Sequence, residues 1–216
     1  MKLDQKKIKK IISFATEAGK LKELERFRGQ FYWRNYPQRD RYESVADHTW
    51  RIALFLILIK DFLKRKIDLT KALQMIVVHD LPEIVTGDES PLGDDGTGKK
   101  TYAFDPLKAK KRHANEKKAA KHLFGQLPKE QKQRLFELWL EYEEQKSFES
   151  KLIKSLDKLE AVLQVQEYRK GSFFKEHLDF NLTYGLRGSE IDPVVTELAR
   201  FLKSSMLRSF KEYKNK

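Results

Sequence analysis

Apolar residues recur along most of this chain at three- and four-residue intervals, the spacing that places them on one face of a helix. No stretch alternates apolar and polar residues for long enough to predict a strand. Capping residues and helix breakers divide the pattern into helices over residues 44–63, 70–86, 105–124, 129–145, 147–169 and 192–210. The pattern therefore predicts an all-α fold.

Local signals mark several of the helix ends. Ser44-Val45-Ala46-Asp47 is a capping-box pattern, in which a hydroxyl and a carboxylate satisfy opposing free amides. Thr70 is the expected cap of the next helix, Pro82 is expected to bend it, and Gly87 to end it. No internal repeat or interdomain linker interrupts the 216 residues, so we expect a single compact helical bundle over residues 1–216.

Ionisable residues interrupt the apolar faces of three of these helices. His48 occupies a core position of the first, and Asp157 is surrounded by apolar positions in the 147–169 helix. The inward face of the 70–86 helix is expected to hold Leu73, Ile76, Val77, Asp80 and Ile84, with His79 and Glu83 along its edge. A histidine or an aspartate of this kind, taken alone, is compatible with an ordinary hydrogen-bonded core residue.

Taken together, the four side chains predict a metal site. Burying an isolated carboxylate or imidazole costs several kcal/mol, and a divalent metal shared by His48, His79, Asp80 and Asp157 would compensate that cost. Two imidazoles and two carboxylates suit Mn, Fe(II), Co, Ni or Zn better than calcium. Such an ion can acidify a water and neutralise a phosphoryl oxygen, so the pattern favours a metallohydrolase.

The composition of the chain limits the kinds of ligand and the kinds of catalysis that are possible. The chain has no cysteine, which excludes disulfides, thiolate catalysis and cysteine zinc sites. Its net charge of +12 favours phosphate-bearing ligands, although the basic residues are spread as on solvated helix faces and no nucleic-acid motif is present. The N-terminus lacks a signal-peptide segment, and the longest apolar run, IALFLILI, is too short to span a bilayer. We therefore expect a cytoplasmic protein without a membrane partner.

The spacing of the four residues resembles a known family. His48, followed 31 positions later by His79-Asp80 and then by a distant Asp157, is similar to the HD-domain metal-dependent phosphohydrolases. The segments ESVADHTWRIAL, VVHDLPEIVTGD and KSLDKLEAV resemble the branch that includes the 5'-deoxynucleotidases, and the similarity covers about residues 20–170. The resemblance implies an HD-domain core with terminal helices packed on it, one divalent transition metal held by these four ligands, and a homodimer.

The resemblance also implies roles for other residues. Glu83 and Asp88 match the acidic pair of the family motif and would act on the water, the substrate hydroxyls or the leaving group. A phosphate-binding arginine precedes the first histidine in the family, and Arg28 and Arg34 are the candidates here. Gly29 follows Arg28, whereas the deoxynucleotidases have a tryptophan at that point.

The leading functional hypothesis is a phosphomonoesterase that releases phosphate from 5'-(deoxy)nucleoside monophosphates. The alternatives are an HD-type phosphodiesterase or alarmone hydrolase, and a basic helical nucleic-acid-binding protein with a structural metal. Residues 89–104 follow Asp88 and are compatible with a lid over the site or with disorder. We expect His113, His122 and His177 to lie on the surface.

Overall fold

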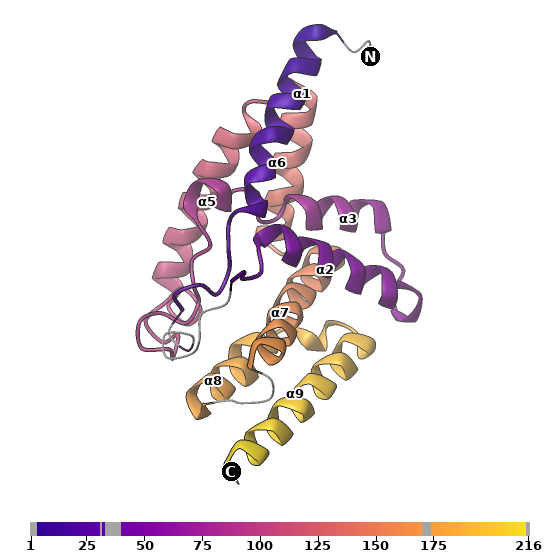
Figure 1. Ribbon diagram of the computed structural model, residues 1–216. Coiled ribbons are helices and arrows are strands. Elements are labelled where there is room, and N and C mark those ends of the chain that lie inside the picture. Colours follow the sequence, from indigo (N-terminus) through magenta and orange to yellow (C-terminus); the bar gives the residue numbers. More distant parts are fainter. Residues whose placement is uncertain (1–3, 31, 33–39, 170–173, 215–216) are drawn as a thin grey trace.

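The computed structural model describes residues 4–30, 32, 40–169 and 174–214, and its regular elements are helices (Figure 1). Within these residues the only β-pairing is an isolated bridge between Glu25 and Ser44, which confirms the all-α prediction. The α-helices are α1 Gln5–Ala18, α2 Val45–Ile59, α3 Leu69–Val78, α4 Glu83–Thr86, α5 Pro106–Phe124, α6 Lys129–Glu143, α7 Phe148–Arg169, α8 Lys175–Phe180 and α9 Pro193–Lys214. Shorter helical turns are η1 Gly19–Lys22, η3 Lys60–Phe62, the π-helical η4 Asn181–Gly185 and η5 Ser189–Ile191.

The long helix α7 is the central element of the fold. It packs against α2, α3, α6 and α9, and the π-helical turn η4 also contacts it (Figure 1). Leu152, Ile153 and Leu156 are completely buried there, so α7 carries much of the hydrophobic core. Because α7 also contains Asp157, this candidate residue is held by a well-packed element.

Helix starts follow the sequence signals in most places. Ser44 and Asp47 form the expected capping box at the start of α2. The predicted Thr70 cap is wrong, because Asp68 caps α3 by accepting a hydrogen bond from the amide of Lys71. Aspartate and threonine are both good caps, and the helix begins two residues earlier than a Thr70 cap would imply.

The helix predicted over residues 70–86 is two helices. α3 ends at Val78, residues 79–82 form turns with three-residue hydrogen bonds, and α4 begins at Glu83. Proline has no amide hydrogen with which to continue the ladder, and here the interruption precedes Pro82 rather than bending the helix there. The inward face also differs from the predicted one: Val77, within α3, is 58% exposed, whereas His79 and Glu83 are 3% and 5% exposed.

Residues 89–104 form a folded segment that packs against the rest of the molecule. Leu92 and Ala103 are buried against Tyr32 and Phe180. The Tyr32 hydroxyl donates a hydrogen bond of 2.7 Å to the carbonyl of Gly96. This segment is therefore folded against α8. In the described part of the chain, no helix has an apolar run long enough to cross a lipid bilayer.

Candidate active site

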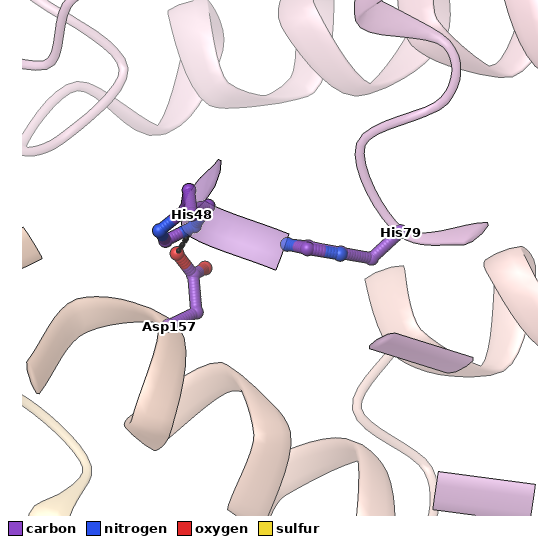
Figure 2. A group of neighbouring side chains, drawn as sticks. All are labelled: His48, His79 and Asp157. Carbon is purple, nitrogen blue, oxygen red and sulfur yellow. Dashed lines mark hydrogen bonds and ion pairs between the residues drawn. The ribbon is translucent and has the colours of Figure 1, made fainter. Parts of the chain in front are cut away.

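Three helical regions bring the predicted metal donors together. His48 comes from α2, His79 and Asp80 from the turn after α3, and Asp157 from α7. His48 Nε2 lies 3.1 Å from Asp157 Oδ1, and the donor atoms of His48, His79 and Asp157 all lie within 4.8 Å of one another (Figure 2). Asp80 Oδ2 is 3.0 Å from His79 Nε2 and 3.8 Å from His48 Nε2. Residues more than 100 positions apart in the chain therefore converge on one point.

The tautomer of His79 leaves a nitrogen lone pair directed at this point. Its Nδ1 donates a hydrogen bond of 2.6 Å to the carbonyl of Ile76, so Nε2 carries no proton in the neutral ring. Nε2 is sealed from solvent and has no hydrogen-bond partner among the described residues, although Asp80 Oδ2 is close. A lone pair facing a carboxylate oxygen is repulsive unless a proton or a metal ion lies between them. The donor set therefore fits a divalent metal.

Glu160 orients His48 from the opposite side of the ring. The Nδ1 group of His48 donates to Glu160 Oε2, and this directs Nε2 toward Asp157. Arg26 and Arg51 also bind the Glu160 carboxylate, at 3.3 and 2.7 Å. Burial favours its neutral form, but His48 and Arg26 outweigh burial and hold the pKa of Glu160 below its usual range. A carboxylate behind a ligating histidine is a common arrangement at metal sites.

Glu43, His48 and Glu160 form a second group of close donors, but it is an ion-pair network. Arg26 Nη1 lies 2.7 Å from Glu43 Oε2, and Arg51 Nη2 lies 3.2 Å from Glu43 Oε1. The two guanidinium groups bind both carboxyl groups, and burial raises the pKa of Glu43 to about 8, so this group needs no ion. Its role is to hold His48.

Asp157 is fixed through one of its oxygens. The Tyr142 hydroxyl donates to Asp157 Oδ2 at 2.8 Å, and Lys154 Nζ lies 3.3 Å from the same oxygen. Oδ1 is the oxygen that faces His48. Burial opposes ionisation of Asp157, but Lys154 and His48 outweigh it and hold its pKa well below the usual range. The carboxylate is therefore charged and has one oxygen left for a ligand.

Glu83 and Asp88 line a cavity above these donors. Arg112 Nη2 lies 3.4 Å from Glu83 Oε1 and is held by Glu116 at 2.6 Å. Burial and the nearby Asp80 raise the pKa of Glu83 well above its usual value. Burial also raises the pKa of Asp88, against the opposing charge of Arg26. The structure therefore brings both predicted acidic residues to the same cavity as Asp80 and Asp157.

The structure separates the arginines that precede the first histidine. Arg28 is absent from the cavity lining; its side chain is 45% exposed and is paired with Glu25. Arg34 lies outside the described residues. Arg26, which the sequence analysis did not select, lines the cavity and is only 13% exposed. Of Arg26 and Arg28, Arg26 is therefore the one that can contact a ligand in the cavity.

Cations and aromatic groups that the sequence analysis also missed complete the cavity. Its charged wall includes Arg112, Lys154 and Lys158, and its apolar wall includes Phe180 and Tyr184. Lys154 lies three residues before Asp157 and Lys158 directly after it, so the sequence alone showed two cations close to this aspartate. The cavity therefore combines four cationic side chains with an apolar surface.

The surface assignment of one histidine, His177, was wrong. His177 is 1% exposed, lines the cavity and stacks on Tyr32 with ring centroids 4.1 Å apart. His113 is half-buried, stacks on Trp139 and pairs with Glu143. His122 is exposed, as predicted. Tertiary contacts, which a single helix face does not show, bury His177.

Comparisons with known proteins agree with this geometry. A family model described as HD domain matches residues 18–199. The chain is 33% identical to the 5'-deoxynucleotidase HDDC2 of Xenopus laevis over 162 residues, covering 75% of this chain and 71% of the relative. The human 5'-deoxynucleotidase HDDC2 is also 33% identical, with 73% and 68% covered.

A solved structure also shares the fold. A predicted metal-dependent phosphohydrolase from Magnetospirillum magnetotacticum superposes with a TM-score of 0.68 at 24% identity, over 95% of this chain and 97% of that chain. This similarity concerns the fold alone, and the family assignment rests on the family model and the sequence relatives. This chain is therefore an enzyme of the HD-domain family, as the spacing of His48, His79-Asp80 and Asp157 predicted.

Proposed function

We propose that this enzyme is a metal-dependent phosphomonoesterase that releases phosphate from 5'-deoxynucleoside monophosphates. The observation that carries the proposal is the buried lone pair of His79 Nε2, which faces Asp80 and converges with His48 and Asp157 below a cavity lined by cations. The relatives named 5'-deoxynucleotidase support the choice of substrate. The cavity, with a charged wall and an apolar wall, suits a ligand with a phosphate at one end and a base at the other.

The proposed metal ligands are His48, His79, Asp80 and Asp157. Two imidazoles and two carboxylates suit Mn, Fe(II), Co, Ni or Zn. When bound, an ion of this kind supplies Lewis-acid chemistry to the phosphoryl group and to a nucleophilic water. The hydrogen bond from His48 to Glu160 and that from Tyr142 to Asp157 keep these donors aimed at the ion site.

The chain's own cations would bind and orient the phosphate. The Nη1 group of Arg26 is held by Glu43 and Glu160, which leaves its other guanidinium nitrogens to reach the cavity. Lys158 lines the same wall, and no carboxylate pairs with it among the described residues. Arg26 thus replaces Arg28 as the proposed phosphate-binding arginine. Positive charge fixed in the cavity stabilises the charge that develops on the transferring phosphoryl group.

Glu83 and Asp88 are the proposed proton-transfer residues. Both line the cavity beside Asp80, and a carboxyl that keeps its proton near neutral pH can give it to a departing 5'-oxygen. Glu83 is the better placed, because it begins α4 one turn after His79 and its carboxylate is fixed by Arg112.

The test is turnover with a defined metal. Metal-free protein is loaded with Mn, Co, Ni, Zn or Mg, and phosphate release is measured with deoxynucleoside and ribonucleoside monophosphates and with a phosphodiester. We expect monoester hydrolysis that Asp80→Asn lowers by at least about 100-fold, because several kcal/mol of electrostatic stabilisation depend on the site. The matched control is Asp61→Asn, a strongly exposed aspartate on η3. Hydrolysis of the diester alone, or full activity of the Asp80 variant, would refute the proposal.

We also propose that the enzyme works as a homodimer that pairs through the outer face of α2. Trp50, Leu54, Ile57 and Leu58 are exposed and follow a helical spacing, so they form one apolar stripe. A two-fold axis would bury this stripe against its own copy. Light scattering should give a dimer that Leu58→Glu converts to a monomer, whereas Leu107→Glu, at an isolated exposed leucine on α5, should have no effect. A monomeric wild type would contradict this proposal.

A further inference from the structure

The cavity changes character along α7. Asp157 and Lys158 lie at its charged end, and the residues that follow on the same face are small and apolar, namely Ala161, Val162 and Val165. Each residue advances about 1.5 Å along a helix axis, so Val162 lies about 7.5 Å beyond Asp157. This offset is comparable with the reach from a 5'-phosphate across a sugar to its base. The apolar end is therefore where the base of a bound nucleotide would lie.

The π-helical turn η4 forms the facing wall at this end. It follows α8 directly and contacts α7 (Figure 1). The packing is tight, since a Cβ on Gly185 would lie 2.6 Å from Val162 Cγ2 and 3.5 Å from Asn181 Oδ1. These two distances place the Asn181 side chain beside Val162. π-Helical turns are rare and are often found at functional sites.

Asn181 presents an acceptor at this end of the cavity. The residue is 4% exposed, and its Nδ2 group donates a hydrogen bond of 2.7 Å to the carbonyl of His177. That bond fixes the amide orientation, and no described residue donates to Oδ1. Asn181 lines the cavity. A buried amide oxygen normally has a donor, so this oxygen is suited to accept one from a ligand.

We infer that Asn181 Oδ1 accepts a hydrogen bond from an exocyclic amino group on the nucleobase, and so makes the enzyme selective for amino-bearing bases. The inference rests on the proposed nucleotidase function and adds a base preference to it. Cytosine and adenine carry an amino group where uracil and hypoxanthine carry a carbonyl. A carbonyl opposite Oδ1 would leave two buried acceptors unsatisfied, whereas Val165, Phe180 and Tyr184 would contact any base equally.

The experiment compares substrates that differ only at this group. The value of kcat/KM is measured for dCMP against dUMP, and for dAMP against dIMP, with the metal-loaded enzyme. We expect the amino-bearing member to be favoured by about tenfold or more, because a site with a buried polar group discriminates strongly against a ligand that leaves it unpaired. Asn181→Leu, of similar size, should reduce both preferences to about threefold or less. Calorimetry with deoxycytidine and deoxyuridine on metal-free protein gives a second readout that needs no turnover.

The control is Thr183→Ala on the same π-helical turn. Thr183 is exposed and does not line this cavity, so the variant should keep the wild-type preference.

Equal kcat/KM values in the wild type, or a preference that survives Asn181→Leu, would overturn the inference while the nucleotidase function stands. If no nucleotide is hydrolysed, the proposed function fails, and calorimetry alone decides: tighter binding of deoxycytidine supports the inference, and equal or no binding overturns it. If Asn181→Leu does not fold, Asn181→Ser replaces it.

Discussion

Replacing Glu160 by glutamine removes one negative charge from the centre of the buried network and leaves its shape unchanged. Glu160 is completely buried and accepts hydrogen bonds from His48, Arg26 and Arg51. Removing one partner from a buried ion pair costs about 3–5 kcal/mol. Because both arginines keep Glu43 as a partner, we expect the lower end, about 3 kcal/mol of unfolding free energy.

The same substitution should weaken metal binding. A carboxylate behind a ligating histidine contributes about 10- to 100-fold in metal affinity, and glutamine can still accept from His48 Nδ1, so we expect about tenfold. Urea unfolding and metal titration are the assays. Glu167→Gln is the control, because Glu167 binds the same Arg51 but is 49% exposed, and such a pair contributes about 0–1 kcal/mol. Equal effects of the two variants would refute the argument that Glu160 acts as a buried charge behind His48.

Three further outcomes follow from contacts near the site. Tyr142→Phe removes the donor to Asp157 and should cost about 1 kcal/mol of stability and weaken metal binding; an unchanged affinity would contradict this. His113 has a raised pKa owing to its glutamate partner in α6, so its contribution is complete below about pH 6.5 and is lost as pH rises through the folded-state pKa. The difference in unfolding free energy between wild type and His113→Gln should therefore become smaller from pH 6 to pH 9. A difference that grows with pH would contradict a raised pKa of His113. Gly185→Ala should cost about 1–3 kcal/mol through overpacking, and Val162→Ala should relieve it; a Gly185 variant as stable as wild type would show that the two helices can move apart.

The sequence singled out the proposed metal donors because each of them has a local signal. His48 and Asp157 interrupt apolar faces of long helices, and a buried ionisable group on such a face needs a partner wherever the helix packs. The phase of a helix carries that information without any knowledge of the fold. The predicted phase was wrong within α3 itself, where Ala72, Met75 and Ile76 are buried and His79 continues their helical spacing, so His79 points inward and Val77 does not.

The wall that contains Asn181 had no such signal. The segment His177–Gly185 contains asparagine, threonine and glycine, which have low helix propensity, and the sequence analysis predicted no helix there. In the structure these residues form α8 and η4. Gly185, the weakest helix former among them, is the residue that lets the turn approach Val162. Tertiary packing against α7 therefore outweighs local propensity, and packing is what a single sequence does not contain.

The choice between Arg26 and Arg28 depends on one backbone angle. In an extended segment, side chains two residues apart point to the same side, so the sequence alone gives no reason to separate these arginines. Phe27 lies between them with φ of 67°, in the left-handed region that phenylalanine rarely adopts. That reversal sends Arg26 to Glu43 and the cavity, and Arg28 outward to Glu25. Such a conformation costs about 1–2 kcal/mol, and the buried ring of Phe27, packed against Tyr168, together with the ion pairs of Arg26, offsets it. Contacts with α7, more than 130 residues away in the chain, thus decide which arginine can reach a phosphate.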